Sequence, residues 1–351
     1  FNQEFRRLLL QDTFVAMCVE RKIPVSTDLN VAKFLVDDAT MGEWNLQGLP
    51  LDNLSVENGI MVTRSDKWPI LVDPQGQAGN WIKNREAENM MRVTTMGDKN
   101  FRNYLEDCLT YGKPMMIEGL TDEIDPILDP VLEKNFTKSG RSFRIMLADK
   151  EVEYNENFRL YMSTKLANPH FAPEVFAKTT VIDFTVTVKG LEDQLLGRVV
   201  QKEKAELEEQ KKELQAEVNR NIKKVVALED DLLQRLSSSQ GDLLQDTELI
   251  DVLARTKQTA QEVKDKLAVA KETELKINSA REEYRPVATR GSIMYFLIAE
   301  MSLVNPMYQT SLSQFLVLFD LAIEKSERAA VSQKRIANII QHLTFSIYQY
   351  I

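Results

Sequence analysis

Hydrophobic side chains recur most regularly in two long charged stretches between Leu191 and Tyr284, on either side of a polar break at residues 237–242. In each stretch they follow one another at alternating steps of three and four residues, which is the heptad spacing of a coiled coil. The pattern predicts two helices of roughly 36 residues, each about 54 Å long at 1.5 Å per residue, that fold back on each other at the break. The seam of the first helix consists of Leu207, Lys211, Leu214, Val218, Asn221, Val225, Leu228 and Leu232, and that of the second consists of Leu249, Leu253, Thr256, Ala260, Val263, Leu267, Ala270, Glu274 and Ile277.

An antiparallel pairing about the break brings these two seams into one predicted register. Leu232 then faces Leu249 close to the break, and Lys204 faces Ile277 at the other end. Polar side chains at seam positions, such as Asn221, lower the stability of a coiled coil and either fix its register or permit sliding. We therefore expect an arm that transmits position or contacts a partner, rather than a passive pair of solvated helices.

Short apolar runs alternate with amphipathic helical patterns before this arm. The run at residues 68–73 is apolar almost throughout, as expected for a strand that is buried on both faces. Strands that alternate with helices, one of them predicted at residues 124–136, indicate a doubly wound parallel sheet. The predicted strands cover residues 68–73, 91–95, 114–118, 144–147, 158–162 and 181–186.

Three apolar helical patterns follow the arm, at residues 293–301, 312–325 and 333–350, and they predict a small helical subdomain. We therefore divide the chain into three parts. These are an α/β domain at residues 1–190, an antiparallel coiled-coil arm at 191–285 and a helical subdomain with a linker at 286–351.

The composition excludes several classes of protein. The 351 residues carry a formal net charge of -9 and no basic stripe interleaved with aromatic residues, which argues against a dedicated nucleic-acid binder. No run of about 18 apolar residues could span a membrane. Cys18 and Cys108 lie in apolar helical contexts and indicate a reducing compartment, and the two histidines stand at no recognisable zinc-site spacing. Because the chain opens on Phe1, with no initiator Met and no signal-peptide pattern, we expect a segment of a longer polypeptide.

The first strand-to-helix turn is where a parallel sheet would carry a phosphate-binding loop of the form GxxxxGK[ST]. If Asn80 takes the Ser/Thr position, then Gly79 replaces the lysine and Ala78 replaces the second glycine. The cation that meets the phosphates and the hydroxyl that holds magnesium are both absent, and Asp73 adds a negative charge where the phosphates would lie. The sequence therefore predicts a degenerate nucleotide loop, which consists of Asp73, Pro74, Gln75, Gly76, Gln77, Ala78, Gly79 and Asn80.

The other positions that an ATPase needs are incomplete as well. At the end of the third strand Glu118 is a single carboxylate, whereas hydrolysis requires an Asp for magnesium and usually a Glu that orients water. Thr164 and Lys165 occupy the place of a polar sensor, and Lys178 is the only other cation between the last two predicted strands. We interpret Glu118, Thr164 and Lys165 as vestigial, and we expect no catalytic residue, no metal and no cofactor in this segment. Weak nucleotide binding is the alternative.

Seven strings of residues, spread over nearly the whole chain, carry a specific family resemblance. They are EWNLQGLP at 43–50, ILVDPQGQA at 70–78, WIKN at 81–84, LDPVL at 128–132, TKLANPHF at 164–171, GLEDQLL at 190–196 and RPVATRGS at 285–292. In these strings the chain resembles the dynein heavy chains, specifically the fifth AAA+ module of the motor ring with its coiled-coil buttress, or strut. Residues 181–190 and 284–301 are most similar to axonemal, outer-arm heavy chains.

The resemblance implies an AAA+ fold and a non-hydrolysing member of an ATP-driven ring, with ATP and magnesium bound at other modules of the parent motor. In that family the buttress leans on the stalk, and ring closure shifts the register of the stalk and its microtubule affinity. The implied partners are the neighbouring AAA+ modules and the stalk of the same heavy chain, microtubules through the parent motor, and other dynein subunits, with no nucleic acid and no membrane. The implied location is the cytoplasm and cytoskeleton, in the axoneme of a cilium or flagellum.

Two alternatives stay open beside this interpretation. The segment could be an ATP-binding AAA+ module with regulatory nucleotide occupancy. It could instead be a scaffold whose charged arm recruits accessory subunits, but the near balance of basic and acidic residues on the arm provides no steering patch.

Overall fold

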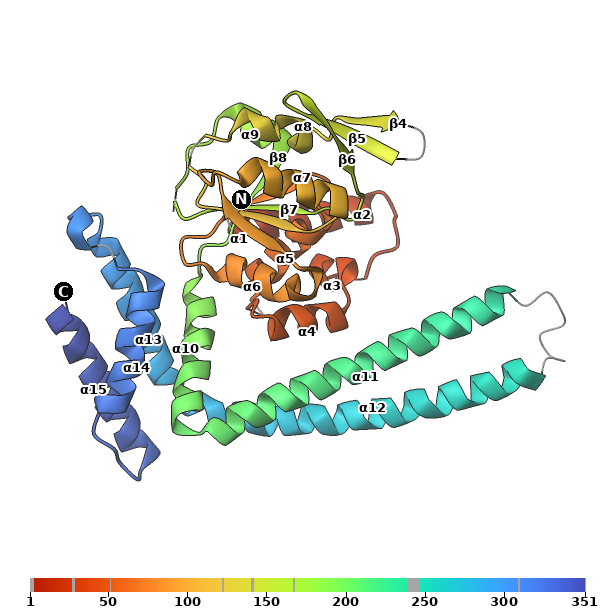
Figure 1. The fold of residues 1–351 in the computed structure, drawn as a ribbon. Coiled ribbons are helices and arrows are strands. Elements are labelled where there is room, and N and C mark those ends of the chain that lie inside the picture. Colours follow the sequence, from red (N-terminus) through yellow and green to blue (C-terminus); the bar gives the residue numbers. More distant parts are fainter. Residues whose placement is uncertain are drawn as a thin grey trace. The chain divides into compact units, whose positions relative to one another are not determined.

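The computed structural model describes residues 3–26, 29–50, 52–121, 123–139, 142–166, 168–238, 247–308 and 310–350. The chain forms two compact units (Figure 1). The sheet unit contains Phe1–Asp37 and Gln47–Thr187, and the arm unit contains Asp38–Leu46 and Val188–Ile351. A parallel sheet with helices around it and a coiled-coil hairpin followed by further helices confirm the predicted fold class. Among the described helices, none combines the length and the apolar character that a membrane crossing requires.

Five parallel strands in the order β2-β3-β7-β1-β8 form the centre of the sheet unit. All residues of the two central strands, β1 and β7, are buried, which explains the continuous apolar run of β1. Ile70 of β1 pairs with Met162 on one side and with Val181 on the other. The strands are β1 (Trp68–Val72), β2 (Arg92–Thr95), β3 (Met115–Glu118), β7 (Leu160–Thr164) and β8 (Thr179–Asp183).

Helices cover this sheet and complete its core. Leu105 and Leu109 of α7 are fully buried in one cluster with Ile117 of β3 and Met162 of β7. The helices of the sheet unit are α1 (Gln3–Arg7), the π-helix η1 (Leu8–Val15), α2 (Ala16–Glu20), α3 (Val31–Leu35), α5 (Asn53–Arg64), α6 (Gln77–Arg85), α7 (Phe101–Tyr111), α8 (Asp129–Leu132) and α9 (Pro173–Lys178), with short 3-10 turns η2 (Ala87–Asn89) and η3 (Pro126–Leu128).

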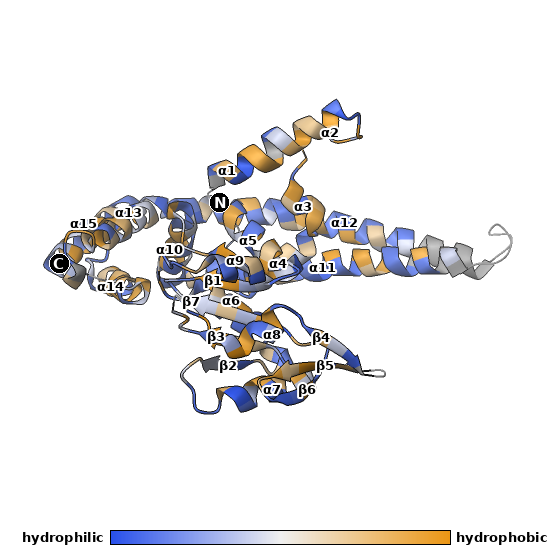
Figure 2. Ribbon diagram, turned by 90° about the horizontal axis from the view of Figure 1, so that it is seen from above, coloured by the Kyte–Doolittle hydropathy of each residue, from blue (hydrophilic) through white to orange (hydrophobic). Residues whose placement is uncertain are grey.

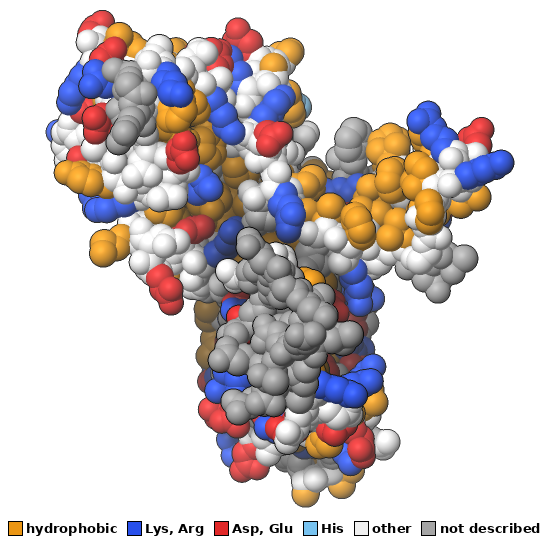
Figure 3. All heavy atoms as spheres, turned by 90° about the vertical axis from the view of Figure 1, so that its right-hand side faces the viewer, with side chains coloured by type: hydrophobic (Ala, Val, Ile, Leu, Met, Phe, Trp, Pro, Cys, Tyr) orange, Lys and Arg blue, Asp and Glu red, His pale blue; other side chains and the backbone are white. Residues whose placement is uncertain are grey.

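The N-terminal helices α1, η1 and α2 leave much of their apolar face uncovered (Figures 2 and 3). Phe5, Leu8 and Phe14 are 40–49% exposed, although Cys18 of α2 is buried. Within the described part of the chain, these helices therefore add little to the core of the sheet unit.

The segment between β3 and β7 differs from its prediction. The helix predicted at residues 124–136 is limited to η3 and α8, each of which has a proline in its first turn, where proline is tolerated. Lys134 then adopts a positive φ of 53° and the helix does not continue. The chain instead forms β4 (Phe136–Ser139), β5 (Ser142–Leu147) and β6 (Lys150–Tyr154), an antiparallel sheet separate from the main one. The predicted strand at 144–147 therefore belongs to this second sheet.

Two long helices, α11 (Ala205–Ser238) and α12 (Thr247–Glu282), lie side by side in the arm unit (Figures 1 and 2). Every predicted seam side chain that the structure describes is buried or half-buried, whereas neighbours such as Glu209 and Lys212 are exposed. The side chains of Leu232, Leu249 and Leu253 lie outside the described residues, as do residues 239–246, which include most of the predicted break.

The predicted register of the two helices is wrong. It places Lys204 opposite Ile277 and hence Glu208 opposite Thr273. In the structure Glu208 Oε2 instead lies 2.9 Å from Arg281 Nε, eight residues further along α12. Eight residues correspond to about 12 Å along a helix, which is more than one ion pair can span while it also crosses between two helices. The helices therefore pair about one heptad away from the predicted register.

The surroundings of Lys211 agree with this shifted pairing. The charges of Arg281 and Glu274 both act on the pKa of Lys211. These two residues lie before and after the α12 position that the shifted register places opposite Lys211. Burial, and then the charge of Arg281, lowers the pKa of Lys211. A hydrophobic pattern that repeats every seven residues is satisfied almost equally after a shift of one heptad, so the charged contacts distinguish the two registers.

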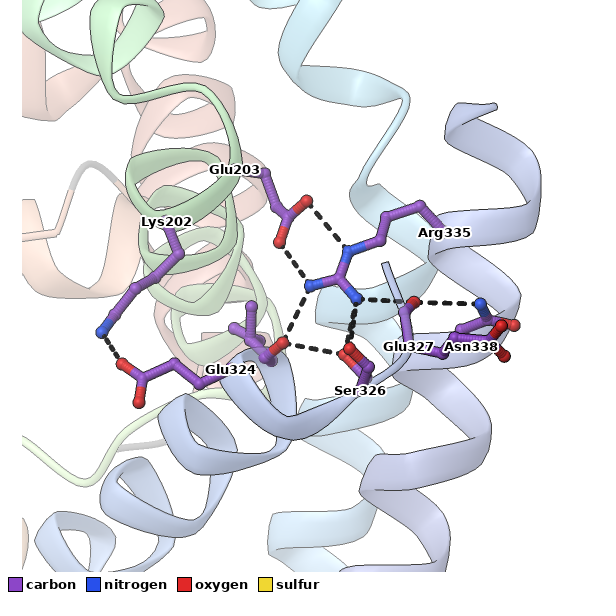
Figure 4. Close-up of polar contacts among 8 residues, drawn as sticks. Lys202, Glu203, Glu324, Ser326, Glu327, Arg335 and Asn338 are labelled. Atoms are coloured by element: carbon purple, nitrogen blue, oxygen red, sulfur yellow. Dashed lines mark hydrogen bonds and ion pairs between the residues drawn. The ribbon is translucent and has the colours of Figure 1, made fainter. Parts of the chain in front are cut away.

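Buried charges fix the base of the arm, where α10 (Val188–Glu203) meets the C-terminal helices (Figure 4). Arg335 is only 5% exposed, and its guanidinium forms a two-pronged pair with Glu203, with distances of 2.7 Å from Nη2 and 3.0 Å from Nε. It also donates to the carbonyl oxygens of Ile323, Ser326 and Glu327 at the end of α14. The helices that follow the arm are α13 (Arg285–Met301), the 3-10 turn η4 (Pro306–Tyr308), α14 (Leu312–Lys325) and α15 (Ser332–Tyr350). Removing one partner of a buried ion pair generally costs about 3–5 kcal/mol, so this contact determines how α10 sits on the helical bundle.

A short helix from the N-terminal half, α4 (Asp38–Leu46), packs on α11 within the arm unit. Asn219 of α11 is not a seam residue, yet it is only 8% exposed because α4 covers it. A Cβ atom on Gly42 would lie 2.7 Å from Asn219 Cγ, so glycine allows the close approach of the two helices. Lys223 and Glu43 form an ion pair beside this contact. The chain thus braces its own arm at a point well above the base.

We predict that Gly42→Ala loosens α4 from α11. The added methyl group overpacks the contact with Asn219, which typically costs about 1–3 kcal/mol. Hydrogen exchange of the α4 amides should become faster in this variant, whereas the double variant Gly42→Ala/Asn219→Ala should recover most of the protection, because the clashing side chain is removed. Equal exchange in wild type and Gly42→Ala would contradict a tight helix contact.

Candidate functional site

The degenerate nucleotide loop connects the end of β1 to the start of α6, at the carboxyl edge of the parallel sheet. Gly76 precedes α6 in a left-handed conformation with φ of 77°, which allows the sharp entry into the helix. The amide of Asp73 donates to Thr164 O over 2.9 Å and so anchors the loop on β7. Within the loop Ala78 and Gly79 are buried, and the side chain of Asn80 is exposed.

The carboxylate of Asp73 occupies the place where this loop would hold a phosphate. Asp73 is only 3% exposed, and its two oxygens accept hydrogen bonds from the backbone amides of Gln77 and Gly79, each over 2.9 Å. Successive backbone N–H groups at a helix N-terminus form the usual binding site for an anion. In this chain that anion is a side chain of the protein itself.

Two opposing effects act on the pKa of Asp73. Burial raises it above the ordinary value of an aspartate, and the hydrogen bonds from Gly79 and Gln77 oppose the rise without cancelling it. The amides therefore compensate for only part of the lost solvation of the carboxylate. A second anion placed at these amides would have to displace the Asp73 carboxylate or lie against its charge.

Glu118, at the end of β3, is engaged by a lysine rather than left open for a metal. Lys83 Nζ of α6 lies 2.6 Å from Glu118 Oε1, and both side chains are partly exposed. Sequence reasoning missed this pair. Lys83 lies on α6, shortly after the loop, at a position where the helix turns one face towards the neighbouring strand ends. That position was the available signal in the sequence.

The remaining predicted positions are occupied by structural contacts or lie in solvent. The Thr164 hydroxyl is fully buried, donates to Leu120 O over 2.7 Å and accepts from the amide of Leu166. Lys165 is exposed. Lys178 donates to Asp129 at 2.9 Å and to Glu133 at 3.0 Å, and these bonds, first the one to Asp129, raise the pKa of Lys178. The sheet thus brings Asp73, Thr164 and Glu118 to one edge, but each of them already has a protein partner.

This arrangement does not fit a magnesium–nucleotide complex. The amides that would meet phosphate bind Asp73, the carboxylate at the end of β3 binds Lys83, and the position of the metal-binding hydroxyl is taken by Asn80. Across the described residues no cluster of three or more His, Cys, Asp or Glu side chains could hold a metal ion. We therefore assign no chemical step to this edge of the sheet.

We predict that Asp73→Ala destabilises the chain by roughly 1–3 kcal/mol, since the buried amide of Gly79 and the half-buried amide of Gln77 lose their acceptor. Because a free anion can then enter the vacated site, added orthophosphate should raise the melting temperature of the variant more than that of the wild type. Asp125→Ala is a matched control, because Asp125 is exposed and accepts from a single amide, that of Ile127. A phosphate effect equal in all three proteins would show that Asp73 does not fill an anion site.

Comparison with known proteins identifies the family. A model of the ATP-binding dynein motor region matches residues 42–263. The chain is 58% identical over 352 residues to the flagellar outer-arm dynein gamma chain of Chlamydomonas reinhardtii. It is 55% identical over 350 residues to dynein axonemal heavy chain 5 of Mus musculus and to dynein axonemal heavy chain 8 of Homo sapiens. Each of these alignments covers 100% of the chain but only 8% of the relative.

Among solved structures, a mutant of Thermotoga maritima RuvB is similar with a TM-score of 0.29 and 12% identity, over 62% of this chain and 69% of that one. This likeness is too weak to bear on the fold. The family match covers well over half of the chain, and the named relatives align along all of it. The chain therefore belongs to the family of the ATP-binding dynein motor region.

Proposed function

We propose that this chain is a non-hydrolysing AAA+ module, the fifth in the ring of an axonemal dynein heavy chain. Its coiled-coil arm, the buttress, relays ATP-driven rearrangement of the ring to the stalk and so controls microtubule affinity. The observation that carries the proposal is the Asp73 carboxylate, which takes both loop amides, in a chain that also builds a long paired arm. The chain spans 8% of the length of the relatives named above, so the motor activity is that of the parent heavy chain.

The pairing of Glu118 with Lys83 supports the non-hydrolysing role. A hydrolytic site needs a carboxylate that is free to hold magnesium or to orient water. Glu118 is the only acidic residue at the end of β3, and its oxygen lies 2.6 Å from a lysine. The lost phosphate-binding lysine and the ion-paired carboxylate are independent defects, so restoring one alone would not restore hydrolysis.

The construction of the arm supports the relay. A relay element must be stiff along its length and firmly attached at its base. The buried pair of Arg335 with Glu203, the pair of Arg281 with Glu208, and the brace of α4 on α11 supply that attachment within the arm unit. The polar seam residues Lys211 and Asn221 lower the stability of the helix pair, which suits an element that responds to force.

The relatives are named as axonemal and flagellar outer-arm proteins. For this chain we propose the same location, the axoneme of a cilium or flagellum. Its proposed partners are the neighbouring AAA+ modules and stalk of its own heavy chain, other dynein subunits, and microtubules through the parent motor.

Regulatory binding of ATP is the second candidate function, and the family description as an ATP-binding region favours it. The occupied loop amides argue against it.

Shortening the arm tests the relay. Removing residues 225–231 together with residues 257–263 from a parent motor deletes one heptad from each helix and preserves the pairing on both sides of the deletion. We expect loss of the coupling between nucleotide state and microtubule affinity, because a shorter arm no longer reaches the position at which it pushes. The measurements are the microtubule-stimulated ATPase rate and the microtubule dissociation constant with and without ATP.

A charge variant of the arm separates the relay from recruitment of accessory subunits. Glu209→Ala/Lys212→Ala removes two exposed charges and leaves the seam and the net charge unchanged. This variant should keep normal coupling. Unchanged coupling in the shortened motor would refute the relay, and lost coupling in the charge variant would favour the scaffold function.

A further inference from the structure

The sheet unit contains a cavity of about 340 Å³ at the edge opposite to the degenerate loop. We call it the basal pocket. Its lining includes the first residues of the two central strands, Trp68 and Pro69 of β1 with Leu160 and Tyr161 of β7. Because the loop follows the carboxyl ends of the same strands, the two sites lie at opposite ends of the sheet. The volume is in the range of small-molecule sites.

Positive charge is concentrated around this pocket. Among the described lining residues five are basic, from four segments of the sheet unit, whereas Asp66 is the only acidic one. The formal charge of the lining is therefore +4 in a chain whose net charge is -9. The five cations are Arg64, Lys67, Arg85, Lys134 and Arg159.

Among the described residues, Arg85 is the only one of these cations with a carboxylate within 4.0 Å. The nearest approach is Arg85 Nε to Glu86 Oε1 at 4.0 Å, and Arg85 Nη1 is buried without a hydrogen-bond partner in the described structure. Within the described residues the hydrogen bonds of Lys134 and Arg159 go to backbone carbonyl oxygens, and the Lys134 ammonium also lies over the ring of Trp68. Elsewhere the chain pairs its well-placed cations, as with Lys83 and Lys178.

The positions of the helix ends explain only part of this cluster. Arg64 and Arg85 are the last residues of α5 and α6, where the exposed carbonyl groups favour a cation. Lys134 follows the C-cap of α8 and belongs to the same class, but that effect does not place Lys67 or Arg159. The basic residues converge on one cavity, and one nitrogen of Arg85 has no hydrogen-bond partner in the described structure. The lining therefore carries an excess of positive charge.

We propose that the basal pocket binds a small multivalent anion of the phosphate class. Guanidinium groups bind phosphate oxygens in pairs with charge-assisted hydrogen bonds, and here three arginines face one cavity. Several surrounding lysine and arginine charges match a ligand with two or more negative charges better than a single carboxylate. The site is separate from the degenerate loop and requires no nucleotide at the other end of the sheet.

Calorimetric titration of the full 351-residue chain with sodium pyrophosphate, orthophosphate and citrate tests the proposal. Pyrophosphate should bind more tightly than orthophosphate and citrate, and its affinity should fall as salt is raised. Arg64→Gln/Lys67→Gln should weaken pyrophosphate binding about tenfold or more, because two charge-assisted contacts are lost. Both side chains are exposed, so the variant should retain its fold, which circular dichroism checks.

A matched control removes the same charge from the other edge. Lys99→Gln/Lys165→Gln replaces two exposed lysines near the carboxyl ends of β2 and β7 and should leave binding unchanged. The proposal is overturned by any of four results. These are no pyrophosphate binding, equal affinity in Arg64→Gln/Lys67→Gln, loss of binding in the control variant, or citrate binding as tightly as pyrophosphate.

Discussion

A side-chain carboxylate and a phosphate cannot use the same loop amides at the same time, and this constraint decides what the sheet unit can do. Asp73 lies at the end of the central strand β1 and takes the amides of Gln77 and Gly79. Burial raises the pKa of Asp73. The two amides nevertheless hold its carboxylate, and the hydrogen bond to β7 anchors its backbone. The turn is thereby closed by the protein, and Glu118 and Thr164 around it serve structural contacts. A sheet with such an edge is suited to act as a rigid anchor, whereas a working nucleotide site must exchange its ligand.

The arm unit is organised by charge as much as by its apolar seam. Arg335 is buried and binds both the Glu203 carboxylate and carbonyl oxygens at the end of α14. The pair of Arg281 with Glu208 sets the register of the two arm helices near their base. Buried pairs of this kind add little net stability but are costly to break, so they favour one arrangement over its neighbours. The brace of α4 on α11 adds a second point of attachment, at a contact where a Cβ atom on residue 42 would clash with the Asn219 side chain.

Much of this architecture could be predicted from the sequence, because it rests on periodicity. The continuous apolar run of β1 marks a strand that is buried on both faces, and the heptads around Val218 and Val263 repeat with the period of paired helices. The described seam side chains are buried or half-buried. The register could not be obtained in this way, because a seven-residue repeat leaves neighbouring heptads nearly equivalent. The docking of α4 left no periodic signal, since it depends on a single small residue, Gly42.

The candidate site, too, could be predicted from the sequence only in part. The missing lysine and hydroxyl of the loop were evident from the residues at positions 79 and 80, and the extra charge of Asp73 was evident as well. That this charge points into the loop and takes its amides depends on the backbone conformation around Gly76, which residue types alone do not specify. The cations of the basal pocket are widely spread along the chain, from Arg64 to Arg159, so only the fold brings them together.

The most direct test of whether the degenerate nucleotide loop excludes nucleotide is a high-resolution structure of the chain determined in millimolar magnesium and ATP. The account predicts no nucleotide or metal in the turn at residues 73–80, with both Asp73 oxygens within hydrogen-bond distance of the amides of Gln77 and Gly79. A triphosphate with its metal seated on those amides, and Asp73 displaced from them, would contradict it.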